Sequence, residues 1–574
     1  MEYLVIIHIG PVQDFIASAR RSRDLWFGSW LLSELSKVAA YVIAEKEGIE
    51  SLIFPAPEEL PDLAPNSSFD VANKIVAIIK SNPKEICEQA LTNVKARLNE
   101  IKEDAFKKLY KYFDGETANA QIADMLETFW VATKLGEYDE TRKRAEALMA
   151  ARKSTKNYKK ILWGKAGIPK SSFDGQREAV IDPGKFPEEE LLRNCRIKPS
   201  EYLCGVSLLK RHGERGKGND RFFSTSHVAA LPFLELLKEE NKAAVRKYIL
   251  TLKQDLGLES ELGNVPGDAH PAFENYDGHI LFKERLEDLF AVKDKNLDKA
   301  KEALQNFYKN CQLENKRPSP YYGLLLGDGD RMGEAIDTQN TRDKHRNISQ
   351  ALSRFASNVR NIVPKHKGSL VYAGGDDVLA FVPIHTILDC AFELNQDFKQ
   401  KLKAFRVPKK SPNDNDSPTL SVGIAIVHHL DPLSDSLELV RKAEKAAKSV
   451  AGKNALAVTV SKRSGVDLTI KGSWGQIDER LKTWITLHAN NQIPDGLAYE
   501  LRDLTITLGD VPKDLMQAEA KRIFRRKKVD EKFLANIEQT IDKGEVSVKD
   551  LADELVVARI FAEAEKLISK GKGD

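Results

Sequence analysis

The 574-residue chain is poor in cysteine and holds no long apolar run. Its five cysteines are scattered, and no two are spaced as a CxxC pair, so neither a disulfide framework nor an intact zinc ribbon is expected. No segment approaches the roughly 20 apolar residues of a membrane span. The apolar run at residues 3–9 is too short for a signal peptide. The sequence therefore predicts a cytoplasmic protein without a membrane partner.

An excess of charge of one sign is also missing. The 88 Lys and Arg residues nearly balance 85 Asp and Glu residues, for a net charge of +3. A global basic field for holding nucleic acid is excluded, so contact with RNA phosphates must come from local patches such as residues 521–528. That patch equally fits a solvated basic helix or a surface for a small helical partner.

The patterns of apolar residues divide the chain into four parts. Residues 1–140 follow the order β-α-β-β-α-β of a ferredoxin-like unit, and residues 319–464 repeat that order. Residues 141–318 read as a mainly helical insert, and residues 465–574 as a C-terminal helical bundle. The predicted fold class is thus α+β. The elements expected in the first unit are strands at 3–9, 51–54, 74–79 and 128–133 and helices at 12–46 and 83–113.

The most informative motif is the Gly-Gly-Asp-Asp (GGDD) stretch formed by Gly374, Gly375, Asp376 and Asp377. Apolar runs flank it on both sides, which is typical of a β-hairpin. Glycine permits unusual backbone angles and close approach of a ligand to the main chain. Adjacent carboxylates repel each other, so they suit a divalent cation held between them and a phosphate. A plain surface turn also fits, because Gly and Asp are common turn residues.

A third carboxylate is expected beside this hairpin. Asp328 ends the first strand of the second unit, which lies next to a hairpin strand in a ferredoxin-like sheet. Asp328, Asp376 and Asp377 should then converge and hold two Mg²⁺ or Mn²⁺ ions. Two such ions can activate a hydroxyl and stabilise a leaving pyrophosphate. Asp330, from the same loop, is a further candidate metal ligand.

Two lysines near the end of this unit are candidates for phosphate binding. Lys448 and Lys453 lie on either side of Gly452, a plausible helix stop, and could hold a triphosphate as point charges. They also fit a solvated helix end, where the helix dipole favours cations. Their occurrence with Asp328 and the GGDD stretch in one βαββαβ unit favours a nucleotide-polymerising domain.

With these residues, the chain resembles the large subunit of type III CRISPR–Cas effector complexes of the Cmr (III-B) kind. The similar stretches are residues 10–29, 324–333, 372–377, 421–425 and 452–455. The resemblance implies two palm domains that face each other. It also implies an enzyme for antiviral defence that condenses ATP into cyclic oligoadenylate messengers when its complex pairs with target RNA. The implied partners are other Cmr-type subunits, including the small helical subunit and the guide-end-binding subunit, with crRNA and target RNA.

The same resemblance implies roles for single residues. Asp328, Asp376 and Asp377 would hold the catalytic metals, and Asp330 is the further candidate. Gly374 and Gly375 would admit the triphosphate of ATP, and Lys448 and Lys453 would bind its phosphates. The first palm would supply a second nucleotide pocket through the turn at Gly10 and through Ser29. In the alternative interpretation, the residues that follow Gly10 only pack and cap the first helix; these are Arg20, Arg21, Arg23 and Trp26.

Two departures from the family pattern change the expected chemistry. The chain begins directly with the first palm and contains no His-Asp dipeptide, so the family's HD nuclease activity is expected to be absent. The family often has a zinc site made of two CxxC pairs. The corresponding residues 171–174 and 204–207 keep only Cys204, so zinc is not expected. A site rescued by Cys195 and His212 is the alternative.

Other functions stay open on the sequence alone. One is a non-enzymatic scaffold of the effector complex, against which the clustered aspartates argue. Another is a stand-alone cyclic-dinucleotide synthase related to diguanylate cyclases, which the doubled palm and the helical parts disfavour. A third keeps the adenylyl transfer but uses an acceptor other than ATP.

Overall fold

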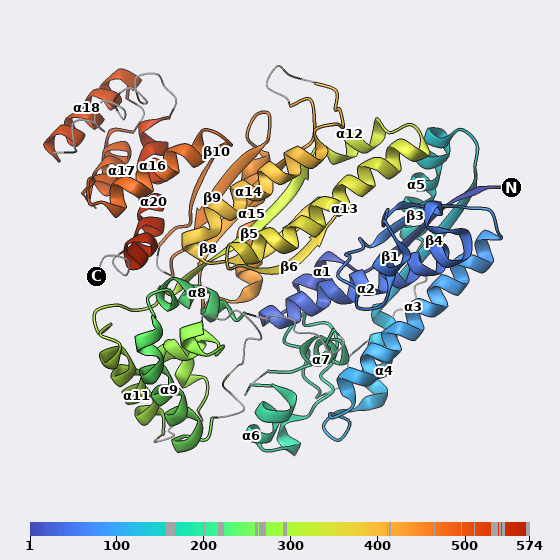
Figure 1. The fold of residues 1–574 in the computed structure, drawn as a ribbon, viewed down its shortest axis with the longest axis horizontal. Coiled ribbons are helices and arrows are strands. Elements are labelled where there is room, and N and C mark those ends of the chain that lie inside the picture. The colour runs from blue at the N-terminus through green and yellow to red at the C-terminus, as the bar shows by residue number, and fades with distance from the viewer. Residues whose placement is uncertain are drawn as a thin grey trace.

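The computed structural model contains two β-sheets, helices that cover them, and helical groups at two sides (Figure 1). It describes all residues except 156–162, 164–166, 199–200, 216–222, 259–261, 263–270, 291–295, 410, 412–414, 464, 495, 510, 528, 530–537, 539–540, 542–545 and 570–574. Among the described helices, none combines the length and the apolar character that crossing a bilayer requires.

The first sheet has the strand order β2-β3-β1-β4, with antiparallel neighbours throughout. This is the order of a ferredoxin-like sheet. Strand β1 alternates between two cores: Val5 and Ile7 join one cluster, whereas Leu4 and Ile6 join another on the opposite face. The strands are β1 (Tyr3–Gly10), β2 (Leu52–Phe54), β3 (Lys74–Ile79) and β4 (Glu127–Lys134).

Helices cover both faces of this sheet. Helices α2 (Ser22–Glu47) and α3 (Pro83–Phe106) pack on the face of Val5. Helix α5 (Tyr138–Ser154) packs on the other face through Tyr138 and Met149. The first unit therefore extends past the predicted boundary at residue 140.

The helix predicted at 12–46 is interrupted, and the helix predicted at 83–113 ends early, at Phe106. The region 12–46 forms α1 (Gln13–Ala17) and α2, because the Asp24 carboxylate accepts hydrogen bonds from the backbone N–H groups of Arg20 (3.3 Å) and Arg21 (3.0 Å) and so starts a new helix. After α3, Asp114 caps α4 (Gly115–Met125) by accepting from the backbone N–H of Thr117 at 3.1 Å.

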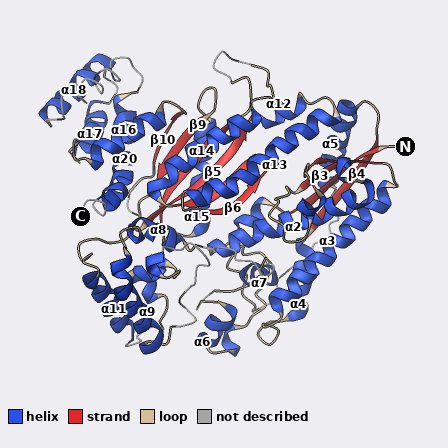
Figure 2. Cartoon of the chain, viewed as in Figure 1, coloured by secondary structure: helices blue, strands red, loops and turns tan. Residues whose placement is uncertain are grey.

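The second sheet has the order β10-β9-β8-β5-β7-β6 (Figure 2). Its part β8-β5-β7-β6 repeats the order of the first sheet, and β9 adds to it parallel to β8. Strand β10 lies in the stretch predicted as a helical bundle, so that prediction was wrong for its first residues. The strands are β5 (Tyr321–Asp330), β6 (Ser369–Gly374), β7 (Asp377–Val382), β8 (Thr419–His428), β9 (Ala455–Val460) and β10 (Leu468–Ser473).

Apolar side chains of the second sheet also serve two cores. Leu325 and Val378 face α13 (Arg342–Lys365) and α14 (Ile384–Leu402). Leu324 and Leu379 face α15 (Leu433–Lys448) and part of the insert. A short helix, α12 (Met332–Asp337), follows β5.

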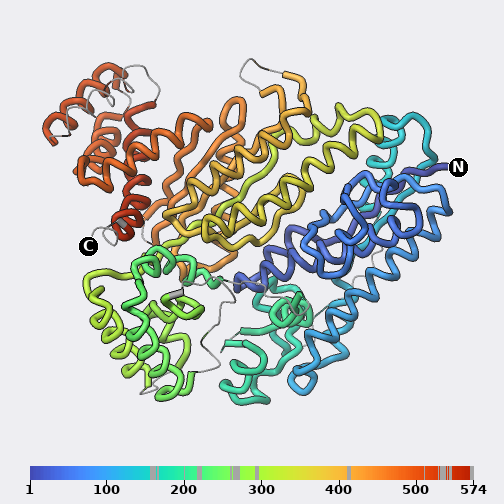
Figure 3. Tube along the Cα trace, viewed as in Figure 1, coloured from blue at the N-terminus to red at the C-terminus, as the bar shows by residue number. Residues whose placement is uncertain are grey.

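The insert divides into two groups rather than forming one domain. Its first group, with α6 (Glu188–Glu190) and α7 (Gly205–His212), packs against α2 and α4 of the first unit. Its second group shares a core with the second sheet (Figure 3). That group consists of α8 (Thr225–Leu234), α9 (Lys242–Leu250), α10 (Lys283–Glu287) and α11 (Asn296–Asn310).

The C-terminal helices form a bundle whose core is continuous with that of the second sheet. The described helices there are α16 (Ile477–Ala489), α17 (Gly496–Leu508), α18 (Lys513–Arg526) and α20 (Val548–Ser569). The basic run at residues 521–527 forms ion pairs on the surface of the bundle, since Arg525 pairs with Glu538 at 2.9 Å and Arg526 with Glu500 at 2.5 Å. Lys528 lies outside the described residues.

Arginines of α13 join the second unit to the first. Arg346 Nε donates to the Leu52 carbonyl at 3.1 Å, and Arg354 Nε donates to Glu58 at 3.0 Å. Arg360 pairs with Asp70 at 2.5 Å. These contacts hold α13 along the β2–β3 connection of the first unit and fix how the two sheets face each other.

Candidate metal centre and adjoining cavity

The GGDD stretch forms the tight hairpin that the sequence predicts. Gly374 pairs with Asp377 across β6 and β7, which leaves Gly375 and Asp376 as the two turn residues. Gly375 has φ of +71°, a backbone conformation that favours glycine. The turn therefore holds the two aspartates at the end of a rigid pair of strands.

The predicted carboxylates converge. Asp328, Asp376 and Asp377 each offer a carboxylate oxygen, and these atoms lie within 4.8 Å of one another. Strand β5 carries Asp328 and pairs directly with β7, which accounts for the convergence. Within the described part of the chain, these residues make up the only such group of three or more His, Cys, Asp or Glu.

Gly329 is a site residue that the sequence analysis missed. A Cβ atom at this position would lie 2.7 Å from Cβ of Asp376 and 2.7 Å from Cγ of Met332. Glycine therefore leaves the space in which Asp376 sits. The alternation Gly-Asp-Gly-Asp at 327–330 was the available signal, because glycine inside a strand often marks close approach of another group.

Burial changes the titration of the two turn aspartates. It raises the pKa of Asp376 to about 6. Burial also raises the pKa of Asp377 to about 7, with further contributions from the negative charges of Asp376 and Glu444. Crowded carboxylates of this kind are stabilised by a bound cation. The donor set of hard oxygen atoms fits Mg²⁺ or Mn²⁺.

Lys448 lies at this centre. Its ammonium group contacts the Asp328 carboxylate directly and lies 3.1 Å from Glu444. Burial, followed by the charge of Lys453, lowers the pKa of Lys448 to about 8. Lys453 has a left-handed conformation, with φ of +53°, in the turn after Gly452. Both predicted phosphate-binding lysines therefore lie on the side of the sheet where Asp328 is found.

Asp330 is not brought into this group. Its side chain is 1% exposed and accepts hydrogen bonds from Thr419 Oγ1 at 2.8 Å, Ser421 Oγ at 2.9 Å and the backbone N–H of Asn454 at 3.0 Å. These bonds tie β5 to β8 and to the turn before β9. The prediction of Asp330 as a metal ligand is therefore corrected, since its acceptor capacity serves the fold.

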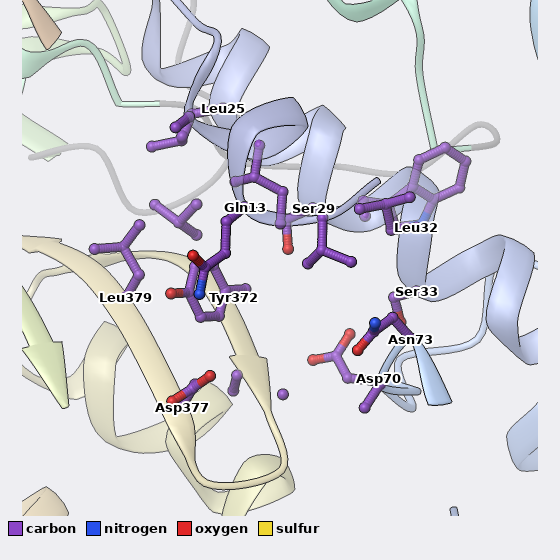
Figure 4. Close-up of a pocket in the computed structure, with 18 of the residues that line it drawn as sticks. Gln13, Leu25, Ser29, Leu32, Ser33, Asp70, Asn73, Tyr372, Asp377 and Leu379 are labelled. Atoms are coloured by element: carbon purple, nitrogen blue, oxygen red, sulfur yellow. The ribbon is translucent and has the colours of Figure 1, made fainter. Parts of the chain in front are cut away.

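A cavity of about 540 Å³ lies between the two sheets and reaches the metal centre at Asp377 (Figure 4). The residues predicted from the two units meet on its wall: Gly10 and Ser29 from the first, Gly374 from the second. A Cβ on Gly374 would meet no atom within 4 Å, so its bare face is open. The apolar part of the wall includes Ile16, Leu25, Leu32, Leu379, Leu437 and Val440.

Several cavity residues escaped the sequence analysis. Asp70 and Asn73 come from the β2–β3 connection, and Arg360 and Arg441 come from helices of the second unit. Tyr372 of β6 lies beside the GGDD turn in the sequence. Their positions depend on how the two units pack, for which these residues give no local signal.

The arginines that follow Gly10 serve the structure. Arg20 Nε donates to the Ser172 carbonyl at 3.1 Å, Arg21 donates to the Arg196 carbonyl at 2.8 Å, and Arg23 donates to the Gly213 carbonyl at 3.0 Å. They bind the insert rather than the cavity. Trp26 differs from them, because it lines the cavity.

Helix α7 of the insert holds the cavity wall in place. Lys210 Nζ donates to the carbonyls of Phe15 at 2.5 Å and Ser18 at 2.6 Å, at the end of α1. Burial lowers the pKa of Lys210 to about 8. Arg211 Nε pairs with Asp24 Oδ1 at 2.8 Å, and its NH2 pairs with Glu201 at 2.8 Å. Adjacent residues of α7 thus fix the end of α1 and the start of α2.

The residues at the degenerate zinc positions come together through hydrogen bonds. The hydroxyls of Ser171 and Ser207 lie 2.9 Å apart, and Cys204 Sγ lies 3.1 Å from Ser207 Oγ. His212 Nε2 donates to the Cys195 carbonyl at 2.9 Å, and burial raises the pKa of the Cys195 thiol to about 11. A structural zinc takes thiolate and imidazole ligands, and this set does not fit it. The absence of zinc stays a prediction.

Two family models match the chain. Residues 4–106 match "CRISPR-associated protein Cmr2, N-terminal", and residues 321–457 match "Cas10/Cmr2, second palm domain". The chain is 27% identical over 557 residues to the CRISPR system Cmr subunit Cmr2 of Pyrococcus furiosus. That alignment covers 80% of this chain and 62% of the relative, so the chain spans less than two thirds of the relative's length.

Solved structures share the fold. A chain of the cryo-EM structure of type III-B Cmr-beta bound to cognate target RNA superposes with a TM-score of 0.62 at 15% identity, covering 98% of this chain and 83% of the other. The apo state of Cmr-beta gives a TM-score of 0.58 at 15% identity, covering 99% and 82%. The likeness therefore extends over nearly all of the present chain.

Proposed function

The chain belongs to the Cas10/Cmr2 family, and from this premise we propose that it is the catalytic large subunit of a type III-B CRISPR effector complex. Its two ferredoxin-like units act as palms that face each other. When the complex pairs with target RNA, the subunit condenses ATP into cyclic oligoadenylate messengers for antiviral defence. Its partners are the other Cmr-type subunits, the guide RNA and the target RNA.

One observation carries this proposal: three carboxylates meet within 4.8 Å at one end of a cavity lined by both palms. A scaffold would have no need for this arrangement, since burial together with the crowded negative charge raises the pKa of Asp377 to about 7. A nucleotidyltransferase does need it. Bound Mg²⁺ or Mn²⁺ would activate the attacking hydroxyl and stabilise charge on the phosphates.

Each group of site residues would have a separate role in the reaction. Asp328, Asp376 and Asp377 would hold the metals. Gly374 leaves room for a triphosphate beside the turn, because its position faces open space. Lys448, which contacts Asp328 in this structure, would move to the phosphates, with Lys453 as the second cation.

The reaction itself is an adenylyl transfer. The 3′-hydroxyl oxygen of one nucleotide forms a bond to the α-phosphorus of an ATP molecule, and the bond from that phosphorus to the β-phosphate oxygen breaks. Pyrophosphate leaves, and the hydroxyl proton passes to water.

The test is an assay of the assembled complex. The complex is mixed with guide RNA, matching target RNA, ATP and Mg²⁺ or Mn²⁺, and the products are identified by mass spectrometry. We expect oligoadenylates with the wild-type subunit and at least a thousandfold less with Asp376→Asn and Asp377→Asn combined, since the metal ligands are lost.

Asp503→Asn is the matched control, because Asp503 is an exposed aspartate on α17 outside the cavity. It should leave the product yield unchanged. A product in which AMP is joined to another molecule would show that the subunit catalyses adenylyl transfer to an acceptor other than ATP. If no product forms under any condition, the catalytic proposal is wrong and the chain acts as a scaffold.

A further inference from the structure

Three neutral hydrogen-bonding side chains on the cavity wall make no hydrogen bond within the described part of the chain. They are Gln13 on α1, Ser29 on α2 and Tyr372 on β6. Gln13 is exposed, and Ser29 and Tyr372 are partly exposed, so a ligand that enters the cavity can reach their polar atoms. In Figure 4 the Gln13 side chain extends from α1 into the cavity toward Tyr372 of the opposite palm.

The surroundings of these groups are apolar. Ile16 and Leu25 come from the first palm, and Leu379 and Val440 come from the second. The wall also holds charged residues: Asp377 belongs to the metal centre, Asp70 is paired with Arg360, and Arg441 is close enough to act electrostatically on Tyr372. A flat apolar body with a few uncharged polar atoms on its edge would match this part of the cavity, which describes a nucleobase.

We propose that Gln13 is a specificity-determining residue that reads the edge of a purine base in this cavity, with Tyr372 and Ser29 as supporting contacts. This inference rests on the proposed function, because it names what selects the nucleotide. The carboxamide of Gln13 donates to N7 of adenine and accepts from its N6 amino group.

The choice of adenine follows from the donors and acceptors. On that edge adenine presents an acceptor beside a donor, which a carboxamide matches with its NH₂ and its oxygen. Guanine presents two acceptors there, N7 and O6, so the oxygen of Gln13 would face another acceptor. A site built to hydrogen-bond one base rejects the base that leaves its groups unpaired.

The test compares nucleotides with the complex assembled on guide and target RNA. Gln13→Met keeps the length of the side chain and removes both hydrogen-bonding groups. We expect the ratio of kcat/KM for ATP to that for GTP to fall by about tenfold or more. Replacement of ATP by 7-deaza-ATP, which lacks the N7 acceptor, should lower kcat/KM about tenfold in the wild type and hardly at all in Gln13→Met.

Asp14→Asn is the control on the same helical turn, because Asp14 is exposed and does not line the cavity. It should keep the wild-type ratios. A Gln13→Met variant that retains both the ATP preference and the penalty for 7-deaza-ATP overturns the inference.

A binding measurement separates this inference from the proposed function. The full chain is titrated with the α,β-methylene analogues of ATP and GTP in the presence of Mg²⁺. Selective binding of the ATP analogue that Gln13→Met abolishes would support the inference even if no product forms. Turnover of ATP with equal binding of both analogues by wild type and variant would retain the function and refute the inference.

Discussion

The two ferredoxin-like sheets share a strand order, yet they differ at the end where chemistry is expected. In the second sheet, a two-residue turn joins β6 to β7 and carries Asp376 beside Asp328 of β5. In the first sheet, residues 55–73 join β2 to β3, and β1 ends at Gly10 without a carboxylate. The shared topology fixes where strand ends meet, whereas the residues of the turns decide what meets there.

The first palm uses the same place for a different purpose. Its long β2–β3 connection brings Asp70 to Arg360 of the other palm, and its first turn presents Gly10 to the cavity. The second unit therefore supplies the three carboxylates of the candidate metal centre, and the first supplies a cavity wall and a contact between the units. This division of roles can be tested at three positions.

Loss of the space at Gly329 should have the largest effect. In Gly329→Ala, the new Cβ would need the position next to Asp376, 2.7 Å from its Cβ. Displacement of a metal ligand by about 1 Å can cost about a hundredfold in rate. We therefore expect product formation to fall about a hundredfold, measured by initial rates in the assembled complex.

Gly333→Ala is the matched control within the same motif. A Cβ at this position would meet no atom within 4 Å, and Gly333 lies in helix α12. Full activity in this variant would attribute the loss in Gly329→Ala to Asp376. Equal loss in both variants would contradict the explanation.

A change of pH should alter the metal affinity, with an effect smaller than that of Gly329→Ala. Metal ions bind the ionised carboxylates, so the protons held by Asp376 (pKa about 6) and Asp377 (pKa about 7) compete with them. Lowering the pH from 8 to 6 should weaken the binding of Mn²⁺ about tenfold to twentyfold, measured by calorimetry on the full chain. A pH-independent affinity would contradict the raised pKa values.

The stability of the metal-free protein should change with pH in the opposite direction to the metal affinity: it should decrease as the pH rises. Both folded pKa values lie above the unfolded value of about 4, so the folded state holds these protons more tightly. The stabilisation is complete below pH 4 and is lost as the pH rises through 6 and 7. The melting temperature should therefore fall less over this range in the double variant Asp376→Asn, Asp377→Asn than in the wild type or in Asp503→Asn.

The contact between the palms should have the smallest effect. Arg360 and Asp70 are partly exposed, with 31% and 17% of their side chains accessible. Such ion pairs contribute up to about 1 kcal/mol, and salt screens them. Arg360→Met should lower the free energy of unfolding by less than about 1 kcal/mol, and a double-mutant cycle with Asp70→Asn would measure the coupling.

The central part of the site could be predicted because its signals are local. Two apolar runs around Gly374 and Gly375 specify a hairpin, and the apolar run before Asp328 specifies a strand, although β5 continues past the predicted end at Asp328 to Asp330. Turn chemistry and strand periodicity are properties of neighbouring residues, so the sequence contains them.

The missed features depend on residues far apart in the chain. The break between α1 and α2 involves Asp24, whose partner Arg211 lies in the insert, and no periodicity reveals such a pair. Strand β10 shows only Ile470 as fully buried, so its pattern was too polar to indicate a strand. In the sequence motif, Asp330 stands where a metal ligand is expected. Only the three-dimensional structure shows that its carboxylate oxygens accept hydrogen bonds from Thr419 and Ser421 instead.

The hydrogen bonds from Lys210 to the end of α1 join two segments that are synthesised at different times. The carbonyls of Phe15 and Ser18 leave the ribosome before Lys210, which follows 195 and 192 residues later. The cavity wall of the first palm is therefore completed only after α7 has been synthesised. Any fragment that ends at the close of the first sheet would lack this support, and its cavity-lining helix α1 would lose the anchor that Lys210 provides.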